Sequence, residues 1–123
     1  MKRIHIALLT VLLLASPMAA SAEGAVSEMA RIMISLNHYP TSAEQKVLAE
    51  IVADNHATAG EKTIAGALMR MQHSVGAEDA ERLRRVAADD SATAAERDVA
   101  GILLGISHQP SKSDISRLKA VAE

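Results

Sequence analysis

The sequence predicts an all-α protein built from a repeated pair of helices. Residues 30–38, 65–73 and 100–108 align when the chain is shifted by 35 positions, and each segment ends in histidine. Apolar residues within each copy follow the three- and four-residue spacing of an amphipathic helix. Tyr39 is the only aromatic residue. The core must therefore consist of aliphatic residues, among which Ala, Leu and Met strongly favour helices.

Residues 1–22 have the features of a bacterial secretory signal peptide. Lys2 and Arg3 precede an apolar run over residues 6–15, and a proline and small residues follow it up to Ala22. The run of about 12 apolar residues is shorter than the roughly 20 that span a bilayer. We therefore expect cleavage after Ala22, no transmembrane segment in the mature chain, and a periplasmic or secreted location.

The mature chain, residues 23–123, has the length of a single domain. Removing Lys2 and Arg3 from the 13 basic residues leaves 11 against 15 acidic residues, so the formal net charge changes from −2 to −4. Nucleic acid is not an expected partner, because a phosphate backbone binds basic surfaces. The chain has no cysteine, so its stability must come from packing without disulfides.

The apolar spacing places two helices in each copy of the repeat. Ile64, Leu68 and Met71 form the stripe of a first helix, and Leu83 and Val86 belong to the stripe of a second. We expect six helices, near residues 24–38, 42–54, 58–73, 77–89, 93–108 and 112–122. They would form three stacked hairpins, at about residues 23–54, 58–89 and 93–123. The stack would be either a short α-solenoid or a compact helical bundle.

The helix boundaries have their own signals. Capping boxes, in which Thr or Ser precedes an acidic residue by three positions, are expected at Thr41, Thr58, Thr93 and Ser111. The unit length resembles that of tetratricopeptide repeats, but the landmark residues of that family are missing in order, so no binding residues are carried over. Gly66 and Gly101 lie in mid-helix, where glycine costs about 0.5–1 kcal/mol, and predict the close approach of a neighbouring helix.

The three aligned histidines, His38, His73 and His108, are the most distinctive feature of the repeat. We expect each at the carboxyl end of a first helix, where an imidazole can donate a hydrogen bond to a free carbonyl of the last turn. Stacked helices lie about 8–10 Å apart, so equivalent histidines would be too far apart to bind one ion. The expected role is structural, with no metal and no cofactor.

A metal site is the alternative interpretation of the same histidines. Imidazole is the commonest metal ligand, and nearby methionines could add sulfur for Cu(I). The three histidines are therefore retained as candidate metal ligands. The candidate sulfur ligands are Met29, Met33, Met69 and Met71.

The remaining signals favour a binding protein over an enzyme. The chain has no thiol, no nucleophile-elbow motif, no glycine-rich phosphate loop and no His–Glu pair at metal spacing, so no catalytic residue is assigned. We expect an adaptor, chaperone-like or structural factor that acts through an unknown protein partner or self-association. A periplasmic metal-binding or metal-stress protein is the alternative. Candidate partner contacts are the features found in one copy only: Tyr39, Arg70 and the basic cluster of Arg82, Arg84 and Arg85.

Overall fold

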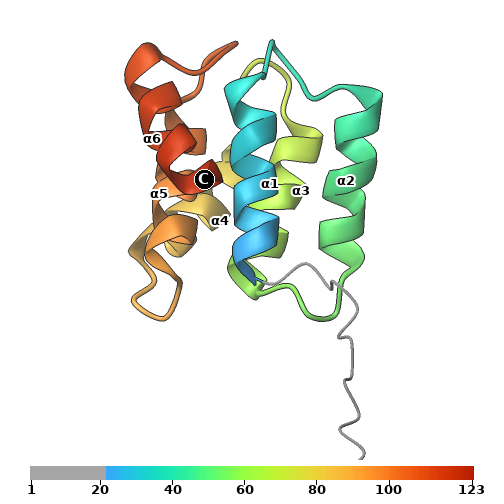
Figure 1. Cartoon of the computed structure of the whole chain (residues 1–123), viewed down its shortest axis with the longest axis vertical. Coiled ribbons are helices and arrows are strands. Elements are labelled where there is room, and N and C mark those ends of the chain that lie inside the picture. The colour runs from blue at the N-terminus through green and yellow to red at the C-terminus, as the bar shows by residue number, and fades with distance from the viewer. Residues whose placement is uncertain (1–21) are drawn as a thin grey trace, which may run out of the picture.

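The computed structural model describes residues 22–123, which form six α-helices and no strand (Figure 1). The helices are α1 (Ala22–Ile34), α2 (Ser42–Ala53), α3 (Ala59–Arg70), α4 (Ala77–Ala88), α5 (Ala94–Gly105) and α6 (Lys112–Ala122). The predicted signal peptide lies outside the described residues, apart from Ala22. Across the described part of the chain, no helix has the length and apolar content that crossing a membrane requires.

The helices close on themselves into a compact bundle. Helices α1, α3 and α5 each contact the other two, and they form its centre. On the outside, α2 packs against α3, α4 against α5, and α6 against α1 (Figure 1). The most extensive pairs therefore cross the borders of the predicted hairpins. Contact between α6 and α1 excludes the open α-solenoid, so the structure is the compact helical bundle, the other predicted architecture.

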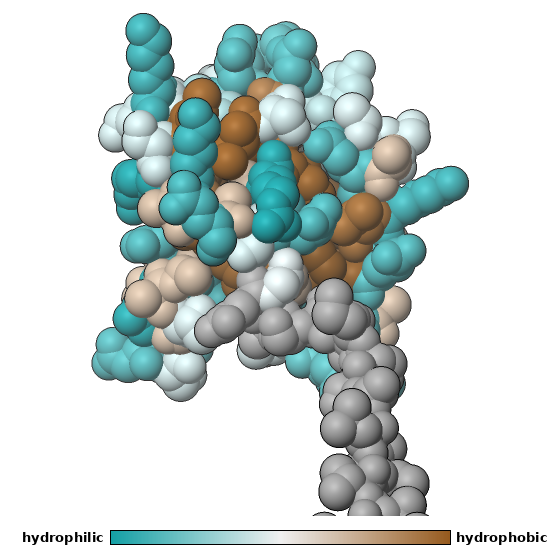
Figure 2. Space-filling view, viewed as in Figure 1, coloured by the Kyte–Doolittle hydropathy of each residue, from teal (hydrophilic) through white to brown (hydrophobic). Residues whose placement is uncertain are grey.

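The core consists of the predicted apolar stripes. Ile64, Leu68 and Met71 of the second copy are at most 2% exposed. The corresponding residues of the other copies are also buried: Met29, Met33, Leu36, Val99, Leu103 and Ile106. Hydrophilic side chains cover most of the face in Figure 2, and hydrophobic residues are visible only between them. Burial of these aliphatic stripes supplies most of the stabilisation.

The small residues at the centre are alanines, so the prediction for the two mid-helix glycines is wrong. Ala30, Ala65 and Ala100 of the three inner helices are fully buried. Gly101 is exposed, and a Cβ added there would meet nothing within 4 Å. Gly66 is buried, and the atoms nearest to a Cβ added there belong to the guanidinium of Arg70 from its own helix.

The helix starts match the predicted signals, whereas the ends of the inner helices do not. Capping boxes are present at the start of α2, α3, α5 and α6. Helices α1, α3 and α5 end at Ile34, Arg70 and Gly105, before the predicted ends at residues 38, 73 and 108. Pro40 and Pro110 lie two positions after His38 and His108. A proline disfavours helical backbone at the residue that precedes it. The three histidines therefore lie in loops.

Candidate metal centre

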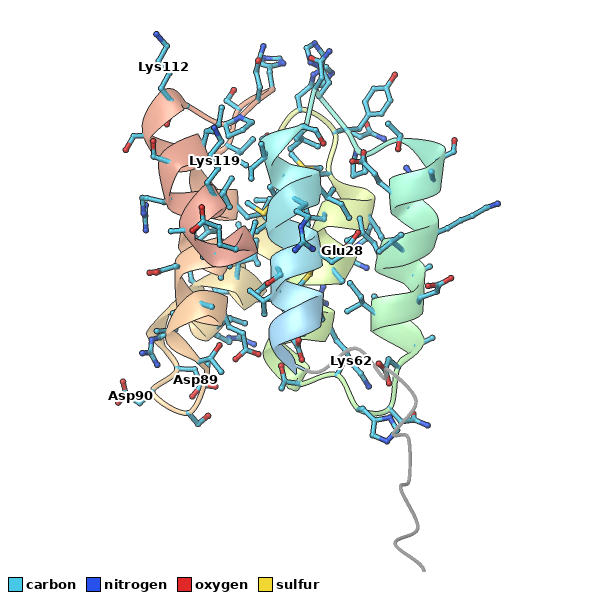
Figure 3. All side chains as sticks on the ribbon, viewed as in Figure 1. Glu28, Lys62, Asp89, Asp90, Lys112 and Lys119 are labelled. Carbon is cyan, nitrogen blue, oxygen red and sulfur yellow. The ribbon has the colours of Figure 1, made fainter. Side chains whose placement is uncertain are left out.

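The loops that follow α1, α3 and α5 meet at one end of the bundle (Figure 1). In Figure 3, Lys112 marks this end, and Asp89 and Asp90 lie at the opposite end. One histidine from each loop joins a closed ring of backbone hydrogen bonds. The amide of His38 donates to the carbonyl of His108 at 2.7 Å, His73 donates to His38 at 2.9 Å, and His108 donates to His73 at 2.7 Å. This ring ties the first loop to the third and closes the bundle.

The backbone at each of these histidines is left-handed. Their φ angles are 73°, 70° and 68°, and no other non-glycine residue of the described chain has a positive φ. The amide of Tyr39 donates to the carbonyl of Asn37 at 2.9 Å, which makes a γ-turn around His38. A γ-turn of positive φ is rare and strained, and left-handed backbone costs a non-glycine residue about 1–2 kcal/mol. Glycine would relieve the strain, yet all three positions carry imidazole.

The three imidazoles converge above the backbone ring. Their centroids lie 4.8–4.9 Å apart, and one nitrogen from each ring lies within 4.8 Å of the other two. The Nδ1 atoms of His73 and His108 are 3.0 Å apart, and Nδ1 of His38 is buried without a hydrogen-bond partner. His73 and His108 are exposed. Among the described residues, this is the one cluster of His, Cys, Asp or Glu with the size and spacing to hold a metal ion.

This geometry overturns both expectations that favoured a structural role. The predicted separation of about 8–10 Å applies to helix axes. The histidines lie instead on loops that bend toward the point where the three copies meet, and their rings are in contact. Among the described residues, no imidazole donates to a carbonyl of the last helical turn: the Nδ1 atoms of His73 and His108 face each other, and Nδ1 of His38 has no partner. A non-glycine residue at positive φ has no sequence signal, so this arrangement could not be read from spacing.

The methionines do not join the cluster. Met29 and Met33 are fully buried in α1, and Met71 is 2% exposed. Met69 is partly buried against the core. The candidate donors at this end of the bundle are therefore nitrogen atoms alone, and the Cu(I)–thioether variant of the metal hypothesis has no support from packing.

A groove of about 570 Å³ adjoins the cluster between α2 and α3. His73, Tyr39 and Arg70 line it, so the structure brings one metal candidate together with two of the predicted partner contacts. Tyr39 is 61% exposed. Met69 and Met71, named above only as candidate sulfur ligands, also line the groove, together with Gln45 and Gln72, which were not predicted. Residues 69–73 are consecutive, but Tyr39 and Gln45 come from another loop and from α2, so no sequence pattern connects the two sides of the groove.

The predicted basic cluster is paired with acidic partners. Arg70 donates from Nε and Nη2 to the two oxygens of Asp79 at 3.0 and 2.7 Å, and Arg82 donates to the same carboxylate at 3.3 Å. The Arg70 guanidinium holds the pKa of Asp79 below its usual value, against the opposing effect of burial. Arg84 and Arg85 pair with Glu81 on the surface of α4. Each of these four arginines lies near a carboxylate, but Arg70 and Arg82 share Asp79, and Arg84 and Arg85 share Glu81, so the group keeps a net positive charge.

Two buried carboxylates lie where α3 and α5 begin. Glu61 is fully buried and Glu96 is 3% exposed, and each closes a capping box. Burial raises the pKa of Glu61, whose Oε2 has no hydrogen-bond partner. Burial also opposes ionisation of Glu96, but hydrogen bonds from the hydroxyl of Thr58 and the backbone of Thr93 outweigh it, and the pKa of Glu96 is lowered.

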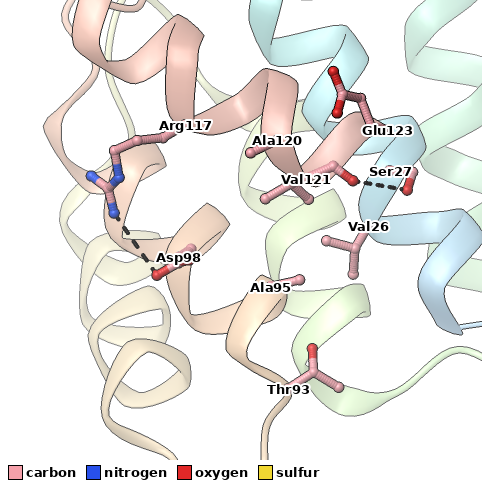
Figure 4. A pocket seen from close by; sticks show the side chains of 9 residues that line it. All are labelled: Val26, Ser27, Thr93, Ala95, Asp98, Arg117, Ala120, Val121 and Glu123. Atoms are coloured by element: carbon pink, nitrogen blue, oxygen red, sulfur yellow. Dashed lines mark hydrogen bonds and ion pairs between the residues drawn. The ribbon is translucent and has the colours of Figure 1, made fainter.

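A second pocket of about 630 Å³ opens between α1, α5 and α6 (Figure 4). The Asp98–Arg117 ion pair, at 3.9 Å, lies on one side of it, and the hydroxyl of Ser27 donates to the carbonyl of Val121 on the other. Val26 adds an apolar wall. Glu123 adds a second carboxylate to the lining. Among the described residues, only the three histidines form a set of donors spaced to hold a metal ion, so this pocket is the weaker candidate.

Comparison with known proteins identifies no relative of this chain. No protein family model, curated protein or solved structure matches the chain. The function is therefore inferred from the chain's own residues.

Proposed function

We propose that the protein binds one divalent transition-metal ion through His38, His73 and His108. The observation that carries this proposal is their convergence, with one nitrogen of each ring within 4.8 Å of the others. Imidazole nitrogens bound to zinc at about 2.0–2.1 Å lie about 3.3–3.5 Å from one another. The Nδ1 atoms of His73 and His108, at 3.0 Å, are already close to that spacing, and the third ring lies within 4.8 Å of both.

The strained backbone supports a role for the side chains. Each histidine occupies a left-handed position that glycine would adopt without cost. Strain of this kind is found mainly where a site requires it, at ligand clamps and active centres. Contacts between the rings offset part of the cost, by about 0.5–1.5 kcal/mol for a pair of aromatic rings. Metal binding explains why all three positions are histidine and not glycine.

The donor set favours borderline metals. Three neutral imidazoles suit Zn²⁺, Cu²⁺, Ni²⁺ or Co²⁺, whereas Cu(I) prefers sulfur and Mg²⁺ and Ca²⁺ prefer oxygen. With four methionines packed in or against the core, the proposal rests on nitrogen ligands alone. We therefore expect the centre to bind zinc or a similar divalent transition-metal ion.

We further propose that this centre belongs to an exported protein made of three 35-residue units. Each unit contributes one helix to the centre of the bundle and one histidine to the ring. The predicted cleavage after Ala22 would place the mature chain in the periplasm or outside the cell. Action through a protein partner remains a prediction, with Tyr39 and the candidate arginines as its contacts, although each arginine also lies near an acidic residue of the chain.

The test uses Tyr39 as a reporter, since it is the only aromatic residue and follows a proposed ligand. Mature protein freed of metal with a chelator is titrated with Cu²⁺ while tyrosine emission is recorded. We expect quenching that ends at one ion per chain, and its loss in a variant with glycine at all three histidine positions. His56→Gly is the matched control, because His56 lies beyond the other end of α2. Equal quenching of the wild type and the triple variant would contradict the proposal.

A further inference from the structure

We propose that the zinc-loaded three-histidine centre activates a bound water molecule to hydrolyse small carboxylic esters. This inference rests on the proposed metal site and extends it to a reaction. It is drawn from three features of the described residues: the number of ligands, the charge of the surroundings, and the groove beside His73.

The number of ligands leaves one coordination position open. Structural zinc sites use four protein ligands, whereas catalytic sites use three and keep the fourth for water. The cluster contains three imidazoles and, among the described residues, no carboxylate or thiol. Because His73 and His108 are exposed, solvent reaches the centre. A water molecule is therefore the expected fourth ligand.

The sequence neighbours of the ligands leave the charge of the ion uncompensated, and Arg70, the charged side chain that lines the groove beside His73, is itself paired with Asp79. The residues on either side of the three histidines are neutral and exposed: Asn37, Tyr39, Gln72, Ser74, Ser107 and Gln109. Three neutral ligands lower the pKa of zinc-bound water to about 7, compared with about 9 for the aqueous ion. A carboxylate in the ligand set would reduce the positive charge and oppose this effect. The neutral surroundings thus favour a bound hydroxide at neutral pH.

The groove beside the cluster suits the organic part of an ester. Its volume of about 570 Å³ lies in the range of small-molecule sites. Met69, Met71 and Tyr39 offer apolar surface, and His73 belongs both to the groove and to the metal cluster. An ester whose acyl or aryl group rests there would present its carbonyl to the ion.

The reaction balances without another reactant. The oxygen of the zinc-bound hydroxide forms a bond to the carbonyl carbon, and the π electrons of the carbonyl move to its oxygen. When the carbonyl re-forms, the bond to the alkoxy or aryloxy group breaks, and that group leaves with the electron pair and takes a proton from water. The acid product loses its proton to solvent, and a new water molecule binds zinc and is deprotonated.

The test measures zinc content and hydrolysis of p-nitrophenyl acetate on the same mature protein. We expect one zinc per chain and a rate roughly tenfold or more above that of the triple glycine variant with the same zinc, because only an ordered site generates the nucleophile. The rate should rise as the pH passes about 7, where the bound water ionises. Tyr39→Ala should raise KM while leaving the zinc content unchanged. His56→Gly should match the wild type.

A second readout does not depend on turnover. With Co²⁺ in place of zinc, the visible spectrum should change with the same pH midpoint as the rate, and added acetate should shift it by displacing water. Stoichiometric zinc with no hydrolysis above the triple variant would overturn the catalytic inference and leave the metal site standing. Absence of zinc binding would remove both proposals.

Discussion

The positive φ angles of the three histidines give a prediction that separates backbone strain from side-chain function. Two triple variants are compared, one with glycine and one with alanine at residues 38, 73 and 108. Both lack the imidazoles, so ring contacts and metal ligands are lost equally. The variants differ only in how well the new residue tolerates the observed φ angles of 68–73°.

The expected difference follows from two opposing effects. At each position alanine pays about 1–2 kcal/mol for left-handed backbone. Glycine avoids that cost but loses about 0.4–1 kcal/mol through the greater freedom of the unfolded chain. The net advantage of glycine is about 0.5–1 kcal/mol per position, so the triple glycine variant should be about 1.5–3 kcal/mol more stable than the triple alanine variant.

Urea unfolding in the presence of a chelator, followed by far-ultraviolet circular dichroism, measures this difference. A triple asparagine variant should fall between the other two, because asparagine tolerates left-handed backbone better than alanine does. If the alanine variant is as stable as the glycine variant, the histidines are not held in strained turns, and the backbone argument for their function is refuted.

Three further predictions concern sites away from the histidines. Asp79→Asn should lower the free energy of unfolding at neutral pH by only about 1 kcal/mol, since the Arg70 side chain is 57% exposed and its charge is screened. Because the pKa of Asp79 is lowered in the folded state, this loss should disappear as the pH falls through that pKa, which urea unfolding at several pH values would show. Glu61→Gln should show the opposite pH dependence. Because the pKa of Glu61 is raised in the folded state, the stability of the wild type should decline as the pH rises from the unfolded-state pKa through the folded-state pKa. The same urea measurements should show that the variant lacks this decline. Gly101→Ala should raise the free energy of unfolding by about 0.5–1 kcal/mol, because a Cβ there meets nothing, and a lower melting temperature would contradict this.

The sequence was most informative about local structure. Four capping boxes and the apolar stripes placed six helices and most of the core, because both depend on residues close together in the chain. Val52 of α2 is an exception, because its place in the apolar pattern predicts burial and it is 40% exposed. Nothing local showed that α2 would pack on α3 more extensively than on α1, or that α6 would return to α1.

The candidate site was likewise predictable only in its local part. Sequence spacing selected His38, His73 and His108, but their convergence depends on closure of the bundle and on a left-handed backbone that no glycine signalled. The groove depends on Tyr39 and Gln45 meeting the end of α3. Such contacts between distant elements are set by tertiary packing, which a repeat pattern alone does not specify.

X-ray absorption spectroscopy of the zinc-loaded mature protein tests the three-histidine centre most directly. We expect three imidazole nitrogens and one additional light atom at about 2.0–2.1 Å from zinc, in a four-coordinate site. The three imidazoles should be recognisable by the scattering of their ring atoms, and this signal should be lost in the triple glycine variant. A spectrum with oxygen ligands alone, or with one imidazole per zinc, would contradict the proposal that the three loops hold one ion.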